Sequence, residues 1–103
     1  MKVLATTAWD VTPARVPDFL ANCGRAAEIH RRLGAEAVHL IQSMAGPVPA
    51  LTYALVFPDG ATYGAFIDTI STDDEWLALW AEASAGERYA TIVSQSVGTD
   101  LFS

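Results

Sequence analysis

The chain has 103 residues, enough for one folded domain, and 51% of them are apolar while only 17% are charged. Its formal net charge of −6 would repel a phosphate backbone, its single cysteine excludes an intramolecular disulfide and a Cys-rich metal site, and no run of about 18 apolar residues is present to span a membrane. We therefore expect one domain over residues 1–103 in the cytoplasm, with neither nucleic acid nor a membrane as partner.

The first part of the sequence predicts a strand, a helix and a second strand. Residues 2–11 are rich in β-branched and apolar side chains and end before Pro13, which closes a strand and can open a helix. Residues 13–33 predict an amphipathic helix that ends at Gly34. Residues 36–44 predict the second strand. The apolar positions of the helix recur at steps of three and four: Val16, Phe19, Leu20, Cys23, Ala27, His30 and Leu33.

The third predicted strand, residues 50–57 after a GPVP turn at 46–49, is apolar on both of its alternating faces. A strand with one face in water would carry a polar residue at every second position. Both faces of the sheet are therefore expected to be covered at this strand.

The second half predicts two helical segments and a last strand. A PDG turn at 58–60 precedes a short helical stretch at 61–70. The segment from Thr72 to Glu75 matches a capping box, so another helix should begin near Asp73 and end at Gly86. Residues 88–97 predict the last strand, and residues 98–103 a tail that pairs or packs on a partner.

This order of elements predicts a ferredoxin-like α+β fold, βαββαβ, in which a four-stranded antiparallel sheet carries helices on one face. Helices on one face leave the other face of the third strand uncovered. A second copy of the chain is the commonest way to cover such a face, so we expect a homodimer.

One segment also carries a family resemblance. The sequence STDDEWLALWAEA, which follows a Y-x-x-F stretch at 63–66, is similar to a helix of NIPSNAP-like proteins, although Asp74 stands where proline is frequent. With the element order, the chain resembles the dimeric α+β barrel superfamily of antibiotic-biosynthesis monooxygenases, NIPSNAP-type proteins and muconolactone isomerases. This resemblance implies a dimer of packed sheets with a pocket in each protomer, and it implies no single chemistry.

The two histidines are the candidates for catalysis. His30 belongs to the apolar stripe of the first helix and should face the sheet, where a buried imidazole can act as a base or simply bond a core carbonyl. His39 lies in the second strand and faces either the helices or the dimer interface. The two side chains come within reach of each other only in the first case, and no third ligand for a metal is apparent.

Aromatic residues are the candidates for substrate binding. Trp76 and Trp80 are one helical turn apart, and they form either a core stripe or, with Phe66, a wall for a flat ligand. Trp9 and Tyr53 fall on the same parity of two strands that are adjacent in this fold, so they can complete the wall and orient a substrate through their polar groups.

These features predict a dimer that binds a small apolar or aromatic molecule. The favoured function is a cofactor-independent monooxygenase or isomerase, with His30 or His39 as general base and Tyr53 or Trp9 positioning the substrate. One alternative is a non-catalytic dimerisation or ligand-binding module whose aromatic residues close the pocket. Another is a haem-binding protein in which a histidine is the axial ligand.

Overall fold

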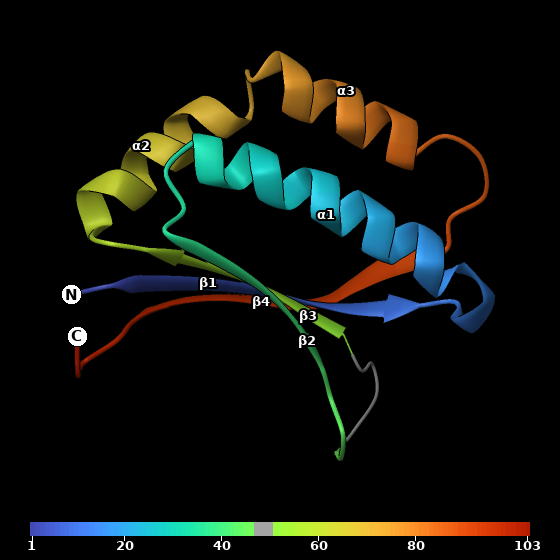
Figure 1. The fold of residues 1–103 in the computed structure, drawn as a ribbon, viewed down its shortest axis with the longest axis horizontal. Helices are drawn as coiled ribbons and strands as arrows, with labels where there is room; N and C mark the ends of the chain where they lie inside the picture. Colours follow the sequence, from blue (N-terminus) through green and yellow to red (C-terminus); the bar gives the residue numbers. More distant parts are fainter. Residues whose placement is uncertain (47–50) are drawn as a thin grey trace.

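The computed structural model describes residues 1–46 and 51–103, which form a four-stranded antiparallel sheet with α-helices on one side (Figure 1). The strand order is β2-β3-β1-β4, so the predicted ferredoxin-like fold is confirmed. The elements in chain order are β1 (Val3–Val11), the 3₁₀ turn η1 (Pro13–Arg15), α1 (Val16–Arg32), β2 (Ala37–Gln42), β3 (Leu51–Phe57), α2 (Gly60–Ile70), α3 (Asp74–Ala83) and β4 (Ala90–Thr99).

The register of the strands defines two faces of the sheet. Thr7 of β1 pairs with Tyr53 of β3 and Gln95 of β4, and these three side chains share the face toward the helices, which we call the helix face. Ala54 of β3 pairs with Thr6 and with His39, on the opposite or open face. Side chains alternate along a strand, so every residue of the sheet core is assigned to one face by this register.

Strand β3 is buried along the helix face and, on the open face, at Ala54 alone. Tyr53, Leu55 and Phe57 are buried beneath the helices, and Ala54 on the open face is only 5% exposed. Ala54 is small and lies between two neighbouring strands, whose side chains flank it. Its burial therefore needs no second chain, and the two-faced apolar pattern of β3 is weaker support for a dimer than the sequence suggests.

Helix α1 begins and ends close to the predicted residues. The proline at position 13 opens a 3₁₀ turn, and the α-helix starts only at Val16. Gly34 follows the helix with φ +122°, and a Cβ there would lie 3.0 Å from Cγ2 of Thr62. Both its backbone conformation and its neighbour thus require glycine. The helix places five buried residues over the sheet: Phe19, Ala26, Ala27, Ile29 and His30.

Each of the two later helices is capped by an aspartate. The Asp59 carboxylate accepts a hydrogen bond from the Thr62 backbone N–H at 2.7 Å at the start of α2, and Asp73 accepts one from the Trp76 N–H at 3.0 Å at the start of α3. The predicted capping box is therefore one residue out of register, because Asp73 rather than Thr72 is the N-cap. Helix α3 also ends at Ala83, before the predicted Gly86.

Other boundaries differ from the predictions at the strand ends. Strand β2 is shorter than 36–44, and β4 starts and ends two residues later than predicted because Gly98 and Thr99 pair with Leu4 and Val3. Only the last residues of the predicted tail lie outside the sheet. The GPVP turn and the predicted start of β3 at residue 50 involve residues 47–50, which lie outside the described part of the chain.

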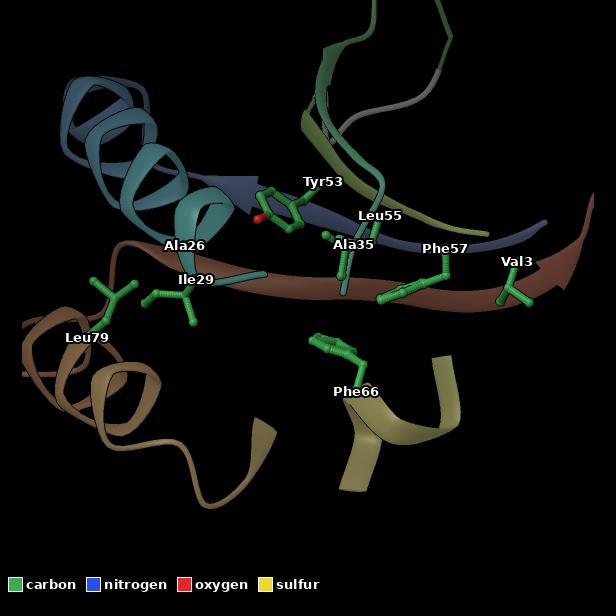
Figure 2. Packing of buried hydrophobic residues seen from close by; sticks show 9 residues of the cluster. All are labelled: Val3, Ala26, Ile29, Ala35, Tyr53, Leu55, Phe57, Phe66 and Leu79. Atoms are coloured by element: carbon green, nitrogen blue, oxygen red, sulfur yellow. The ribbon is translucent and has the colours of Figure 1, made fainter. Parts of the chain in front are cut away.

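The core fills the space between α1, α2 and the strands (Figure 2). Phe57 at its centre is fully buried and contacts Phe66 of α2, with ring centroids 4.9 Å apart. Tyr53 projects from β3 toward α1 (Figure 2). Helix α3 packs on α1 and lies farther from the sheet than α1 does (Figure 1).

Candidate functional site

A cavity of about 630 Å³ lies between α1, α3 and strands β1, β3 and β4. It exists because four small residues face the space from three different elements: Cys23 and Ala26 of α1, Ala83 of α3, and Ala90 of β4. Larger side chains at these positions would fill it. Its volume is within the range of about 300 to 1,000 Å³ that small-molecule sites occupy.

Aromatic side chains form the walls of this cavity. All three tryptophans of the chain, Trp9, Trp76 and Trp80, line it. Trp9 packs edge-on against Phe19 at 5.5 Å, while Trp76 and Trp80 are tilted at 5.7 Å between ring centroids. Trp80 remains 48% exposed, so much of its ring is free to contact a ligand. Trp9 and Tyr53 of the sheet therefore lie around the same cavity as Trp76 and Trp80 of α3.

A buried hydrogen bond joins His30 of α1 to Tyr53 of β3. Nδ1 of His30 and Oη of Tyr53 are 2.6 Å apart, and both side chains line the cavity. The imidazole is held by the rings of Tyr53, Phe66 and Trp76, at centroid distances of 5.4, 5.5 and 4.8 Å. The ring orientation of His30 is thereby fixed from several sides.

Burial keeps both members of this pair neutral. It lowers the pKa of His30 from 6.5 to about 4, because the imidazolium form loses its hydration inside the protein. Burial likewise raises the pKa of the Tyr53 phenol above its usual range, and the negative charge of the Cys23 thiolate would raise it further. At neutral pH the contact is therefore a hydrogen bond between an uncharged imidazole and an uncharged phenol.

The second ring nitrogen of His30, a residue that lines the cavity, is not fully buried. Its Nε2 atom is hydrogen-bonded to no described residue, and no fully buried side-chain nitrogen or oxygen among the described residues is left without a partner. Nε2 must therefore be one of the few points at which His30, 5% exposed overall, is accessible. An imidazole with one nitrogen bonded to the protein and the other open to a ligand is the arrangement that acid–base catalysis uses.

A polar row crosses the floor of the cavity beside this pair. Thr7 lies between Tyr53 and Gln95 in the register of the sheet, and all three line the cavity. At its rim the Asn22 amide donates a hydrogen bond of 2.7 Å to the Tyr89 hydroxyl. Sequence patterns did not single out these positions, or Arg88 nearby. Thr7 could have been found from the sequence, because it lies two residues before Trp9 in β1 and therefore on the same face of that strand.

His39 and Phe66 do not line the cavity. His39 is exposed on the open face, opposite Ala54, with the sheet between it and His30. The two histidines therefore do not converge, and of the two orientations that the sequence leaves open for His39, the structure has the one that faces away from the helices. Phe66 is 5% exposed and packs behind the His30 ring, so it supports the site without touching a ligand.

Neither a reactive thiol nor a metal cluster is apparent. Burial raises the pKa of the Cys23 thiol to about 11, which keeps it protonated at neutral pH. Among residues 1–46 and 51–103, no group of at least three His, Cys, Asp or Glu side chains is placed to hold a metal ion. No helix of this part of the chain is long and apolar enough to cross a bilayer.

Comparison with known structures shows the fold. A NIPSNAP domain protein from Burkholderia xenovorans superimposes with a TM-score of 0.70 at 15% sequence identity, over 97% of this chain and 94% of that one. The chain has the NIPSNAP-like, ferredoxin-like fold. A NIPSNAP family protein of unknown function from Agrobacterium tumefaciens gives a TM-score of 0.69 at 16% identity, over 95% of this chain and 86% of that one.

A third structure is similar over almost the whole chain. It is a putative antibiotic biosynthesis monooxygenase from Nitrosomonas europaea, with a TM-score of 0.63 at 13% identity, over 98% of this chain and 90% of that one. No family model and no curated protein matches the sequence. The predicted resemblance to NIPSNAP-like and monooxygenase-like small proteins is thus confirmed at the level of fold.

Proposed function

We propose that this protein binds a small, largely apolar or aromatic molecule in the cavity, and that the His30–Tyr53 pair moves a proton on that molecule. The observation that carries the proposal is the imidazole of His30, fixed through Nδ1 and open at Nε2 inside an aromatic cavity. A core histidine with a purely structural role would have no need of an accessible nitrogen beside an unfilled space.

The pair can transfer a proton without creating a charged imidazole. In one tautomer Nδ1–H donates to the Tyr53 oxygen, so the lone pair of Nε2 faces the ligand. Nε2 then accepts a proton from the ligand while Nδ1 gives its own proton to Tyr53, and the phenol returns a proton to a second atom of the ligand. Atoms and charge balance, and the buried site never holds an imidazolium, whose formation its low pKa opposes.

Such a relay supports an isomerisation in which a hydrogen shifts between two atoms of one ligand. The same relay converts an enolisable ketone into its neutral enol, an electron-rich molecule that can react with dioxygen as a second substrate. A cofactor-independent monooxygenase or isomerase is therefore the favoured activity. The likeness in fold to a putative antibiotic biosynthesis monooxygenase is consistent with the first of these.

Proton abstraction can be measured before any product is known. We would incubate 2-tetralone, an apolar aromatic ketone with exchangeable α-protons, with the protein in D2O and follow their loss by NMR. Quenching of tryptophan fluorescence reports binding in the same sample, because every tryptophan lines the cavity. Accelerated exchange together with quenching supports the proposal. Quenching without exchange would leave a binding module, and the absence of both would remove the proposed ligand site.

Haem is a less favoured occupant of this cavity. A single arginine, Arg88, lines the cavity to meet the propionates. We therefore derive no chemistry through haem, and an absorption spectrum of the purified protein with a Soret band would overturn this assignment.

The open face supports the proposal of a homodimer. Leu4 and Ile41 project from it with 37% and 53% of their surfaces exposed. Leu4 also borders a shallow hollow that contains Leu101 and Phe102 of the C-terminal tail, and these two are fully exposed or nearly so. Exposed apolar side chains of this kind favour association, and a second copy that packs sheet against sheet would cover them.

A further inference from the structure

The charge around the cavity is opposite to that of the chain. The sequence carries twelve acidic and six basic side chains, a net charge of −6. No Asp or Glu lines the cavity, and Arg88, in the segment between α3 and β4, is the one ionised side chain among its lining residues in the described chain. A region with positive character is thereby placed on an otherwise anionic protein.

Most other basic side chains are neutralised by carboxylates. Lys2 pairs with Glu36 at 2.6 Å, and Arg25 pairs with Glu82 at 2.9 Å. Arg15 and Arg32 also form ion pairs. Arg88 forms no ion pair with a described residue, and the same holds for Arg31, which does not line the cavity.

We infer that the ligand is an organic acid, with an apolar or aromatic body between the tryptophans and a carboxylate at Arg88. This inference rests on the proposed ligand cavity and specifies its substrate class. A guanidinium presents a planar fork that matches a carboxylate, and Arg88 is exposed at the cavity, where a ligand can reach it. The polar row of Thr7 and Gln95 and the open Nε2 of His30 would then meet hydrogen-bonding groups on the body of the ligand.

The charge of the cavity lining also argues against two other classes of ligand, cations and phosphate esters. A cation would find no carboxylate in the cavity, and a phosphate ester would find one guanidinium and no Gly-rich loop of backbone N–H groups. A singly charged carboxylate therefore fits the lining better than a cation or a phosphate.

The test compares two probes of the same shape. 2-Naphthoate and its neutral analogue 2-naphthamide are titrated into the protein at low ionic strength, and tryptophan quenching gives both dissociation constants. We expect naphthoate to bind about tenfold more tightly than the amide, as one charge-assisted contact provides. Arg88→Gln should remove this preference and leave binding of the amide unchanged. Arg31→Gln is the matched control, because it removes an equal charge away from the cavity, and it should retain the preference.

The possible outcomes distinguish failure of the organic-acid inference from failure of the cavity as a ligand site. Equal binding of both probes to the wild-type protein, or a preference that Arg88→Gln retains, would overturn the organic-acid inference while the ligand cavity stands. A preference lost equally in Arg31→Gln and Arg88→Gln would also overturn it, since that result indicates long-range attraction. Binding of neither probe would overturn both the cavity as a ligand site and the inference that rests on it.

Discussion

His30 and His39 are near neighbours in the sequence, and the fold places them in opposite environments. His30 is 5% exposed beneath α1, bonded to Tyr53 and surrounded by aromatic rings. His39 is exposed on the open face of the sheet, where its strand neighbour is Ala54. The first environment excludes water, fixes the imidazole ring and lowers the pKa of His30. The comparison shows that the residue type suggests acid–base chemistry, whereas the face of the sheet decides whether the chemistry is available.

The largest expected difference between the two histidines is in proton exchange. His30→Gln should lower the rate of α-proton exchange in 2-tetralone by about a hundredfold, which is a usual contribution of a general base. His39→Gln should leave that rate within about twofold of wild type, because the sheet separates it from the cavity. A loss of equal size in both variants would contradict the separation of the two faces.

The pH dependence of stability should distinguish the histidines next. The pKa of His30 is about 4 in the folded chain and 6.5 when unperturbed. Between these values the unfolded chain binds a proton that the folded chain does not, so the free energy of unfolding falls as the pH drops from 6.5 toward 4, by on the order of 2 kcal/mol.

Urea unfolding at several pH values between 7 and 4 measures this effect. The fall should be absent in His30→Gln over that range and should persist in His39→Gln, which retains the buried imidazole. Acidic groups such as Asp59 and Asp73, whose pKa values are lowered by their hydrogen bonds, contribute at the acid end and are common to all three proteins. An unaltered slope in His30→Gln would show that His30 is not held neutral by burial.

The two faces should also differ in assembly. Ile41→Lys places a charge on the open face and should weaken the proposed dimer by about tenfold or more, measured by sedimentation at micromolar concentration. Ile67→Lys is the control, because Ile67 is similarly exposed, at 47% against 53%, but belongs to α2 in the helix layer. If the wild-type protein is a monomer, or if both variants dissociate alike, the open face is not the dimer interface.

The smallest expected effects are on the stability of variants at the cavity. Tyr53→Phe removes one partner of the 2.6 Å contact and should cost about 1 kcal/mol in the free energy of unfolding.

Cys23→Leu, which fills the cavity from α1, should alter stability by less than this amount while it blocks binding of 2-naphthoate. Equal binding in Cys23→Leu and wild type would place the probe outside the cavity.

Much of the fold could be predicted because it depends on local patterns. The helical stripe that contains His30, the shared parity of Trp9 and Tyr53, and the glycine after α1 are each visible in the sequence, and the structure agrees with them. The parity of β2 groups His39 with its alternate neighbours but does not say which face they occupy. That choice depends on pairing with β3, which is a long-range contact.

The rest of the site arises from contacts between distant elements. The cavity requires small residues on α1, α3 and β4 to face one another, and no window of sequence contains all three. The register of β4 shifts by one residue between Ala8 and Trp9, so that Gln95 and Ile92 both lie on the helix face, and such an irregularity has no clear mark in the residues. In the sequence, Arg88 is an ordinary residue before a strand. It becomes notable in the structure because no carboxylate lines the cavity.

The most direct test of the central claim is an NMR titration of the two imidazoles in ¹⁵N-histidine-labelled protein, with and without 2-tetralone. We predict that His30 remains neutral until the pH approaches about 4. Its Nε2 resonance should move when the ketone binds, while the Nε2 resonance of His39 should stay where it is. A His30 that titrates near 6.5, or a ligand that shifts His39 and leaves His30 unchanged, would contradict the assignment of the buried pair as the functional site.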